Sequence, residues 1–260
     1  KRVQALCGAK NHMIIMPDAD TGQAVDAAMG AAYGAAGARC LAVSAVLAVG
    51  DDTADRFVEQ LAPKVRALKI GQFDEPGVEM GPVITKDAKD RIIGYIDQGE
   101  SNGAKVVVDG RNLSLQGYEN GFFVGGTLLD HVTPDMSVYR DEIFGPVLSV
   151  LRPQSYDEAV QLVMSHEYGN GTAIFTRDGD AAREFASTIN IGMVGVNVPI
   201  PVPVAYHSFG GWKASMFGDH SIHGMEGVRF YTKLKTVTAR WPSGIKDGAV
   251  FNFHSGSETK

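Results

Sequence analysis

The 260-residue sequence predicts an α/β fold, in which helices cover the faces of a β-sheet. Short apolar runs alternate along the chain with longer segments whose apolar residues recur at helical spacing. Hydrophobic residues make up 44% of the chain and charged residues 21%, so the chain can bury a large core. The sequence contains no internal repeat and no low-complexity tract.

The expected strands are short, rich in Val, Ile, Leu and Phe, and bounded by turn residues. The first is residues 13–16, which Pro17-Asp18 closes as a turn. The remaining candidates are residues 41–49, 105–109, 122–124, 147–151, 172–176 and 194–198.

Helices are expected between these strands. Asp20 or Thr21 can cap the first helix, which we expect to continue through Tyr33. Residues 27–38 are all Ala or Gly except Met29 and Tyr33. Because these side chains are so small, this helix lets other backbone segments approach closely. Further amphipathic helices are expected over residues 55–68, 88–99, 157–164 and 181–188.

The C-terminal part of the chain shows loop and strand patterns. Residues 199–203 alternate proline with apolar residues, which favours an extended surface segment. Residues 210–227 are glycine-rich and predict a loop, whereas residues 229–240 alternate as in an exposed strand. Because an exposed strand edge offers unpaired donors and acceptors, we expect this segment to self-associate or to stay mobile.

Composition argues against several classes of protein. The 24 basic and 30 acidic residues give a net charge of −6, which offers no basic field for nucleic acid or an anionic membrane. Apolar stretches stop well short of a membrane span. Cys7 and Cys40, the two cysteines, cannot build a disulfide framework and fit a reducing intracellular compartment. Since Lys1 opens directly onto strand-like sequence, we expect a piece of a longer protein.

Cys40 is the first candidate for chemistry. It follows Gly37-Ala38-Arg39 at the end of the Ala/Gly helix, where backbone amides can converge on one point. A neighbouring cation favours the reactive thiolate form of a cysteine, and Arg39 is such a cation. The alternative is that Cys40 is a small buried hydrophobe, because free cysteines are usually buried. Cys7 has no adjacent arginine and is expected to be inert.

Glu142 and Phe144 form a second candidate pair, at the entrance to the strand of residues 147–151. In an extended chain, residues two apart face the same side, so this carboxylate and ring could hold a sugar hydroxyl and stack a planar group. A simple turn before a strand is the alternative. His220 and His223 have H-x-x-H spacing, but no cysteine or carboxylate cluster completes a ligand set, so no metal is expected. No nucleotide-binding glycine motif is present.

These motifs, in this order, resemble the aldehyde dehydrogenase family from one end of the chain to the other. Within the family, the resemblance is to the branch that oxidises malonate and methylmalonate semialdehydes. The segments that carry the resemblance are Gly8-Ala9-Lys10-Asn11-His12, Gly37-Ala38-Arg39-Cys40, Gly117-Tyr118-Glu119-Asn120-Gly121, Glu142-Ile143-Phe144-Gly145-Pro146-Val147, Tyr168-Gly169-Asn170-Gly171-Thr172-Ala173, Ile174-Phe175-Thr176, Val196-Asn197-Val198-Pro199-Ile200-Pro201-Val202-Pro203 and Phe209-Gly210-Gly211-Trp212-Lys213.

The resemblance implies the family's catalytic domain, an open and mostly parallel sheet with helices on both faces, plus a protruding C-terminal oligomerisation strand. It also implies that the chain is the C-terminal half of a longer enzyme. Residues 1–16 would end the NAD-binding domain, 17–228 would form the catalytic domain, 229–241 the oligomerisation strand and 242–260 a tail. A homo-oligomer (dimer or tetramer) is implied, in a bacterial cytoplasm or a mitochondrial matrix.

The resemblance also assigns roles to individual residues. Cys40 would attack the aldehyde, and its backbone amide would supply half of an oxyanion hole. Arg39 would bind the substrate carboxylate, and Phe209 would line the aldehyde pocket. Glu142 would bind the nicotinamide ribose of NAD, with Phe144 packing near the ring.

Leu6 stands where hydrolytic members of the family carry a glutamate that activates water. A leucine cannot take a proton, so the acyl-enzyme would instead be passed to coenzyme A. The implied reaction converts malonate or methylmalonate semialdehyde to acetyl- or propionyl-CoA with loss of carbon dioxide, and the chain alone would be inactive because most of the NAD domain is missing. One alternative is a dehydrogenase of another aldehyde, against which Arg39 and Leu6 argue. The other is a non-catalytic dimerisation module, against which the presence of Cys40 and Glu142 argues.

Overall fold

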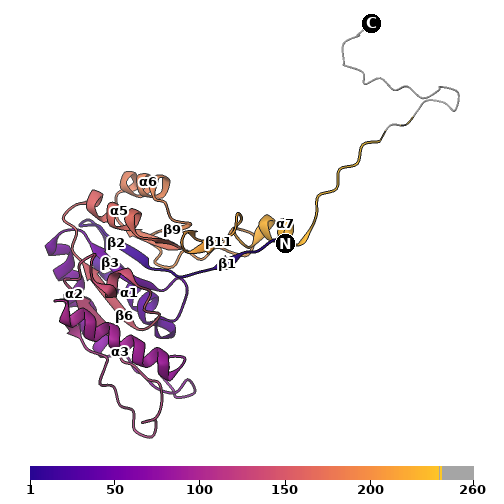
Figure 1. Cartoon of the computed structure of the whole chain (residues 1–260). Coiled ribbons are helices and arrows are strands. Elements are labelled where there is room, and N and C mark those ends of the chain that lie inside the picture. Colours follow the sequence, from indigo (N-terminus) through magenta and orange to yellow (C-terminus); the bar gives the residue numbers. More distant parts are fainter. Residues whose placement is uncertain (240, 242–260) are drawn as a thin grey trace, which may run out of the picture.

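A seven-stranded sheet forms the centre of the computed structural model, which describes residues 1–239 and 241 (Figure 1). The strand order is β4-β5-β6-β3-β2-β8-β9. Neighbouring strands are parallel except β4 and β5, which are antiparallel. The expected α/β fold with a mostly parallel sheet is therefore confirmed. The strands are β2 (Asn11–Ile15), β3 (Val43–Ala48), β4 (Lys105–Val108), β5 (Thr127–Asp130), β6 (Val147–Leu151), β8 (Gly171–Phe175) and β9 (Met193–Val196).

Helices cover both faces of the sheet (Figure 1). From β2 to β3 the chain moves toward the β4 edge of the sheet. From β6 to β8 and then to β9 it moves toward the opposite edge. Right-handed crossovers therefore place α1 (Thr21–Ala28) on one face, and α5 (Tyr156–Ser165) and α6 (Gly179–Thr188) on the other. α2 (Asp51–Arg66) packs against α1, and α3 (Lys86–Ser101) packs against the short helix α4 (Ser137–Arg140).

The helix boundaries follow local signals. α2 carries Asp51 and Asp52 in its first turn and Lys64 and Arg66 in its last, which matches the helix dipole. This acidic first turn explains why α2 begins earlier than the apolar pattern from residue 55 predicts. α1, α3, α5 and α6 begin at side-chain caps, such as the Thr85 hydroxyl, which accepts a hydrogen bond from the Ala88 amide at 3.1 Å.

The central strands are buried on both faces. Met13, Ile14 and Ile15 of β2 have no exposed surface, and the apolar residues of β3 and β6 are almost as fully covered. Parallel strands enclosed by helices need mostly apolar side chains on both faces, which is why these strands read as apolar runs with few polar interruptions, such as Ser44 and Ser149.

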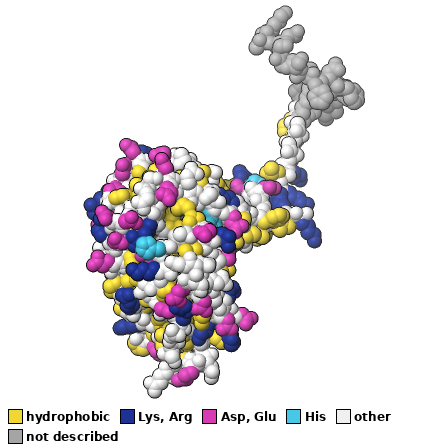
Figure 2. Space-filling model, turned by 60° about the vertical axis from the view of Figure 1, so that its left-hand side comes forward, with side chains coloured by type: hydrophobic (Ala, Val, Ile, Leu, Met, Phe, Trp, Pro, Cys, Tyr) yellow, Lys and Arg dark blue, Asp and Glu magenta, His cyan; other side chains and the backbone are white. Residues whose placement is uncertain are grey.

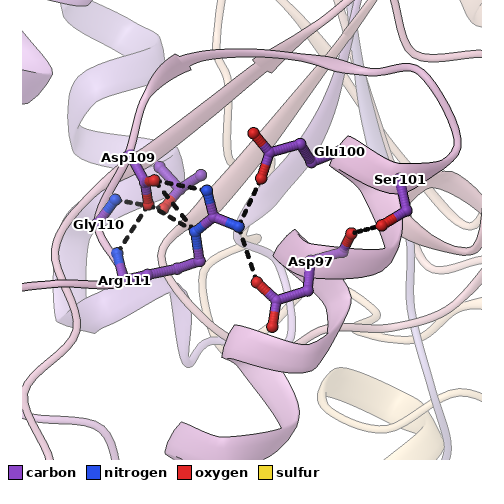
Figure 3. A network of polar contacts seen from close by, with 7 residues as sticks. Asp97, Glu100, Ser101, Asp109, Gly110 and Arg111 are labelled. Carbon is purple, nitrogen blue, oxygen red and sulfur yellow. Dashed lines mark hydrogen bonds and ion pairs between the residues drawn. The ribbon is translucent and has the colours of Figure 1, made fainter.

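Arg111 joins α3 to the end of β4 at the edge of the sheet (Figure 3). Its Nη1 lies 2.7 Å from an Asp97 oxygen and 2.7 Å from a Glu100 oxygen, and its Nη2 lies 2.6 Å from an Asp109 oxygen. One side chain that is 18% exposed thus ties the helix to the edge strand.

One sequence-based expectation fails near the edge of the sheet. The expected strand at residues 122–124 is a loop, and the strand lies instead at β5, just downstream. The cause is a close backbone contact, in which the Gly125 amide donates to the Gly110 carbonyl at 2.8 Å. A β-carbon at Gly110 would lie only 2.0 Å from the Gly125 carbonyl oxygen, so glycine is needed there.

The expected boundary between an NAD-binding domain and a catalytic domain at residue 16 stays a prediction. Residues 11–15 form β2, which lies between β3 and β8 in the same sheet as the strands that follow it. Upstream of them, β1 (Ala5–Leu6) leaves this sheet and pairs with β11 (Met216–Phe217).

An arm extends from the body and consists of β1, β11, α7 (Gly224–Tyr231) and residues 232–239 (Figure 1). α7 replaces part of the loop expected at residues 210–227 and the first residues of the strand expected at 229–240. Residues 232–239 run away from the body without a partner strand in the described chain, and residue 240 lies outside the described residues. Apolar side chains gather on the arm (Figure 2), among them Phe217, Tyr231 and the fully exposed Leu234.

Over the described residues, none of the helices combines the length and the apolar character that crossing a membrane requires.

Candidate active site

The segment before Cys40 departs from a regular helix. α1 ends at Ala28, a π-helical turn covers Met29–Tyr33, and a 3₁₀ turn covers Gly34–Gly37. The expected helix through Tyr33 is therefore present but changes its winding. Ala35 and Ala36 have φ angles of 51° and 53°, in the left-handed region that alanine rarely adopts. Irregular turns of this kind are common at functional sites.

Gly37 brings this loop against the segment of Glu142 and Phe144. A β-carbon at Gly37 would lie 2.2 Å from the Gly145 carbonyl oxygen, so the two backbones touch. Glycine at position 37 is also favoured by its φ of 66°. The close backbone approach that the Ala/Gly sequence predicts is therefore made here, between Gly37 and Gly145.

Cys40 is exposed, which excludes the alternative of a small buried hydrophobe. Its backbone carbonyl accepts hydrogen bonds from Asn11 Nδ2 at 3.0 Å and from Asn170 Nδ2 at 2.8 Å. Asn11 also donates to the Ala42 carbonyl and accepts from the Gly171 amide. Two side chains, one from β2 and one from the residue before β8, thus fix the backbone at Cys40. Cys7 is also exposed.

One pocket brings together four of the five residues that the sequence singled out. Cys40 and Arg39 lie on one side of its lining, and Glu142 and Phe144 come from the segment before β6. The other lining residues are Ala9, Asn11, Gly37, Ala42, Val43, Ser44, Ile143, Gly145 and Val147.

Arg39 is exposed beside Gly34. A β-carbon at Gly34 would lie 3.2 Å from the Arg39 guanidinium, so the glycine leaves room for it. Within the described chain Arg39 forms no ion pair. Its charge is therefore unpaired within the described chain.

Glu142 and Phe144 meet the pocket through a turn. Phe144 has a φ of 55°, so the extended geometry from which we argued their common side is wrong, although both side chains do line one pocket. Glu142 is half-buried, and its Oε1 accepts a hydrogen bond from the Ala9 amide at 3.0 Å. Burial raises the pKa of the Glu142 carboxyl, and the Ala9 amide, Lys10 and Arg91 partly offset that rise.

Phe209 is the fifth predicted residue, and it does not line this pocket in the described structure. It is 9% exposed and packs with Leu41 and Met193 in a small separate core. Phe209 therefore contacts Leu41, the residue after Cys40, and not the pocket itself. Leu6 is exposed and pairs with Met216 in the ladder between β1 and β11.

A buried polar cluster lies beside the pocket, and sequence reasoning did not single it out. Lys10 is 2% exposed, and its Nζ donates to the Val138 and Asp141 carbonyls at 2.8 and 2.9 Å. Burial lowers the pKa of Lys10 to about 7, against the opposing charges of Asp141 and Glu142. The one available signal was a lysine placed directly before a fully buried strand.

His12, Tyr139 and His166 continue this cluster. Their rings stack edge to face with centroids 5.2 to 5.4 Å apart, and His12 Nε2 lies 3.0 Å from the Tyr139 hydroxyl. Burial lowers the pKa of both histidines and raises that of Tyr139. The two imidazoles are therefore neutral near pH 7.

His220 and His223 do not converge on one point. His220 Nδ1 lies 2.8 Å from a Glu226 oxygen, whereas the His223 ring faces Phe209. Among the residues with a described position, no group of three or more His, Cys, Asp or Glu side chains could hold a metal ion.

The chain belongs to the aldehyde dehydrogenase family, whose family model matches residues 1–237. A malonate-semialdehyde dehydrogenase of Pseudomonas aeruginosa is 60% identical over 242 residues, which are 93% of this chain and 49% of that protein. The mitochondrial, acylating methylmalonate-semialdehyde/malonate-semialdehyde dehydrogenase of Homo sapiens is 48% identical over 241 residues, 93% of this chain and 45% of that protein. The chain thus spans about half the length of the curated relatives it matches.

Solved structures show the same fold. The methylmalonate-semialdehyde dehydrogenase of Oceanimonas doudoroffii is 57% identical with a TM-score of 0.91, over 94% of this chain and 50% of that one. A Sinorhizobium meliloti protein, provisionally assigned the same activity and crystallised with NAD, is 63% identical with a TM-score of 0.93, over 95% of this chain and 50% of that one.

Proposed function

We propose that this chain is the catalytic, C-terminal part of an NAD-dependent, CoA-acylating dehydrogenase of malonate and methylmalonate semialdehydes. The observation that carries the proposal is the pocket whose lining includes exposed Cys40, the adjacent Arg39, a cation without an ion pair in the described chain, and Glu142 and Phe144. The names of the similar proteins support the same substrate class.

Arg39 supports a substrate that carries a carboxylate. A guanidinium pairs with a carboxylate through two parallel hydrogen bonds, which a lysine cannot reproduce. In malonate semialdehyde a single carbon separates the carboxylate from the aldehyde. Binding the carboxylate to the residue next to Cys40 therefore brings the aldehyde carbon close to the thiol.

Cys40 then acts as the nucleophile. Its thiolate attacks the aldehyde carbon to form a thiohemiacetal, whose oxyanion the Cys40 backbone amide stabilises. Loss of hydride leaves a thioester on Cys40. Loss of carbon dioxide then shortens the acyl group by one carbon, and the carbon that carried the carboxylate takes up a proton. Because Leu6 offers no base to activate water, the thiolate of coenzyme A displaces Cys40 and carries the acyl group away.

Glu142 and Phe144 fit the nicotinamide end of NAD. The Ala9 amide occupies one Glu142 oxygen, which leaves the other free to accept a hydrogen bond from a ribose hydroxyl. The Phe144 ring is 39% exposed on the pocket lining, as a surface for a flat ring requires. When bound, NAD supplies the acceptor for the hydride.

The remaining assignments follow from the same proposal. The upstream part of the enzyme holds most of the NAD domain, the arm contributes to a homo-oligomer, and Phe209 supports the aldehyde pocket from the second core. The compartment is the cytoplasm in a bacterium or the mitochondrial matrix in a eukaryote. The chain by itself is inactive as a dehydrogenase.

Two alkylating agents of similar size test the role of Arg39. Iodoacetate carries a carboxylate and iodoacetamide does not, so Arg39 should raise the rate of iodoacetate at Cys40 selectively. Arg39→Gln should lower that rate at least tenfold, since a charge-assisted hydrogen bond contributes about 1.5–3 kcal/mol and 1.4 kcal/mol is a factor of ten. Its rate with iodoacetamide should change little.

Cys7 is the internal control, because it is exposed and has no adjacent arginine. Peptide mass spectrometry follows both cysteines in one sample. Equal loss of both rates at Cys40 would favour a dehydrogenase of a neutral aldehyde. Cys40 reacting no faster than Cys7 with either reagent would favour a non-catalytic module.

A further inference from the structure

The segment around Lys10 is bonded to the segment before Glu142 at several points. The Ala9 amide donates to Glu142, Lys10 Nζ donates to the Val138 and Asp141 carbonyls, and His12 bonds to the Tyr139 hydroxyl. All of these bonds are 2.8–3.0 Å long. The two segments lie more than a hundred residues apart in the sequence, so the bonds join separate parts of the fold.

Lys10 is an unusual choice for such a buried place. An ammonium group loses its hydration on burial, and a lysine this deeply buried normally needs a paired carboxylate. Within the described chain Lys10 has no ion pair, and its Nζ bonds only to main-chain oxygens. Both oxygens belong to the same short stretch, α4 and the residue that follows it, directly before Glu142.

We propose that Lys10 is a positioning residue, whose amine group spans the Val138 and Asp141 carbonyls and thereby sets where the Glu142 carboxylate enters the pocket. The proposal rests on the assignment of Glu142 to the cofactor ribose. Lys10 touches neither substrate nor cofactor in this account, and it acts only through the position of Glu142.

The geometry favours positioning over general support of the fold. Lys10 bonds to the end of α4, while its neighbour Ala9 bonds to the carboxylate itself, so consecutive residues hold both the backbone before Glu142 and its side chain. The lowered pKa of Lys10 agrees with this tight enclosure. The side-chain oxygen of Ser149 adds a further bond to the Val138 carbonyl at 3.2 Å, which fixes one end of the bridge.

Lys10→Met and Lys213→Met are the matched variants. Methionine keeps most of the length of the lysine side chain and removes its hydrogen-bond donors. Lys213 also bonds only to main-chain carbonyls, those of Val163, Met164 and His166, but these do not line the Cys40 pocket. Two NMR readouts on the 260-residue chain need neither cofactor nor substrate: hydrogen exchange of the Ala9 amide, and the pH titration of the Glu142 carboxyl carbon.

Lys10→Met should lower the protection of the Ala9 amide at least tenfold relative to the amides of β3. It should also raise the pKa of Glu142, because the nearby positive charge is gone. Lys213→Met should leave both readouts as in the wild type. The proposal is overturned if Lys10→Met lowers the protection of all amides by one factor and leaves the Glu142 titration unchanged.

Glu142→Gln keeps the test decisive if Lys10→Met does not fold. Removing the carboxylate should lower the pKa of the Lys10 amine, which is measured through the side-chain ¹⁵N signal of Lys10. The control is Glu59→Gln on the exposed face of α2, which should leave the pKa of Lys10 unchanged. An unchanged Lys10 titration in Glu142→Gln would contradict the bridge. These readouts can succeed although Cys40 proves unreactive, so failure of this inference and failure of the proposed function are separate results.

Discussion

Replacing Asn11 or Asn170 by alanine removes hydrogen bonds that fix the backbone of Cys40. Asn170 makes one such bond, to the Cys40 carbonyl, whereas Asn11 makes three, to the Cys40 and Ala42 carbonyls and from the Gly171 amide. At about 1 kcal/mol for each bond, Asn170→Ala should lower the free energy of unfolding by about 1 kcal/mol and Asn11→Ala by about 3 kcal/mol.

Urea unfolding measures both values. Asn190→Ala is the control, because residue 190 is exposed and its substitution should change the free energy of unfolding by less than about 0.5 kcal/mol. The slope of the free energy against urea should stay the same in all variants. Equal effects of Asn11→Ala and Asn170→Ala, or an Asn11→Ala variant as stable as the control, would refute the reasoning.

Three further outcomes are expected. The pKa of Lys10 falls from 10.5 in the unfolded chain to about 7 on folding, so between these pH values the unfolded chain holds one more proton than the folded chain. The free energy of unfolding should therefore rise as the pH rises through that range, and urea titrations at several pH values should show that Lys10→Met removes this rise. Calorimetry should find no low-micromolar NAD site on this chain, because it contains no glycine loop that cradles a phosphate; such a site would contradict the expectation. Light scattering should show self-association through the arm, since residues 232–239 lack a partner strand within the described chain; a strict monomer with the amides of residues 230–237 protected from exchange would mean that the segment pairs within its own chain.

The sheet was largely predictable because its central strands are enclosed. An enclosed parallel strand is apolar at nearly every position, and residues 147–151 are apolar except at Ser149, whose hydroxyl donates to the Val138 carbonyl. β5 was missed because its ends are polar. Its buried Thr127 accepts from the Gly110 amide, and its buried Asp130 pairs with Arg152 at 2.8 Å. Those partners lie far along the chain, so the strand pattern does not reveal them.

The site divides in a similar way. Cys40, Arg39, Glu142 and Phe144 stand in short motifs, and the resemblance placed them together before the structure did. The contacts that support them join residues that the sequence keeps apart, such as Asn170 with the Cys40 carbonyl. Phe144 shows a further limit, because its left-handed backbone angle replaces the extended geometry that the residue spacing suggested.

Acyl transfer between coenzyme A and Cys40 tests the central claim most directly, because it is the last step in reverse and transfers no hydride. The chain is incubated with propionyl-CoA, and peptide mass spectrometry follows both exposed cysteines. We predict one propionyl group on Cys40, little on Cys7, and loss of the group when free coenzyme A is added. Acylation of Cys7 as fast as Cys40, or of neither cysteine, would contradict the assignment of Cys40 as the nucleophile of a CoA-acylating enzyme.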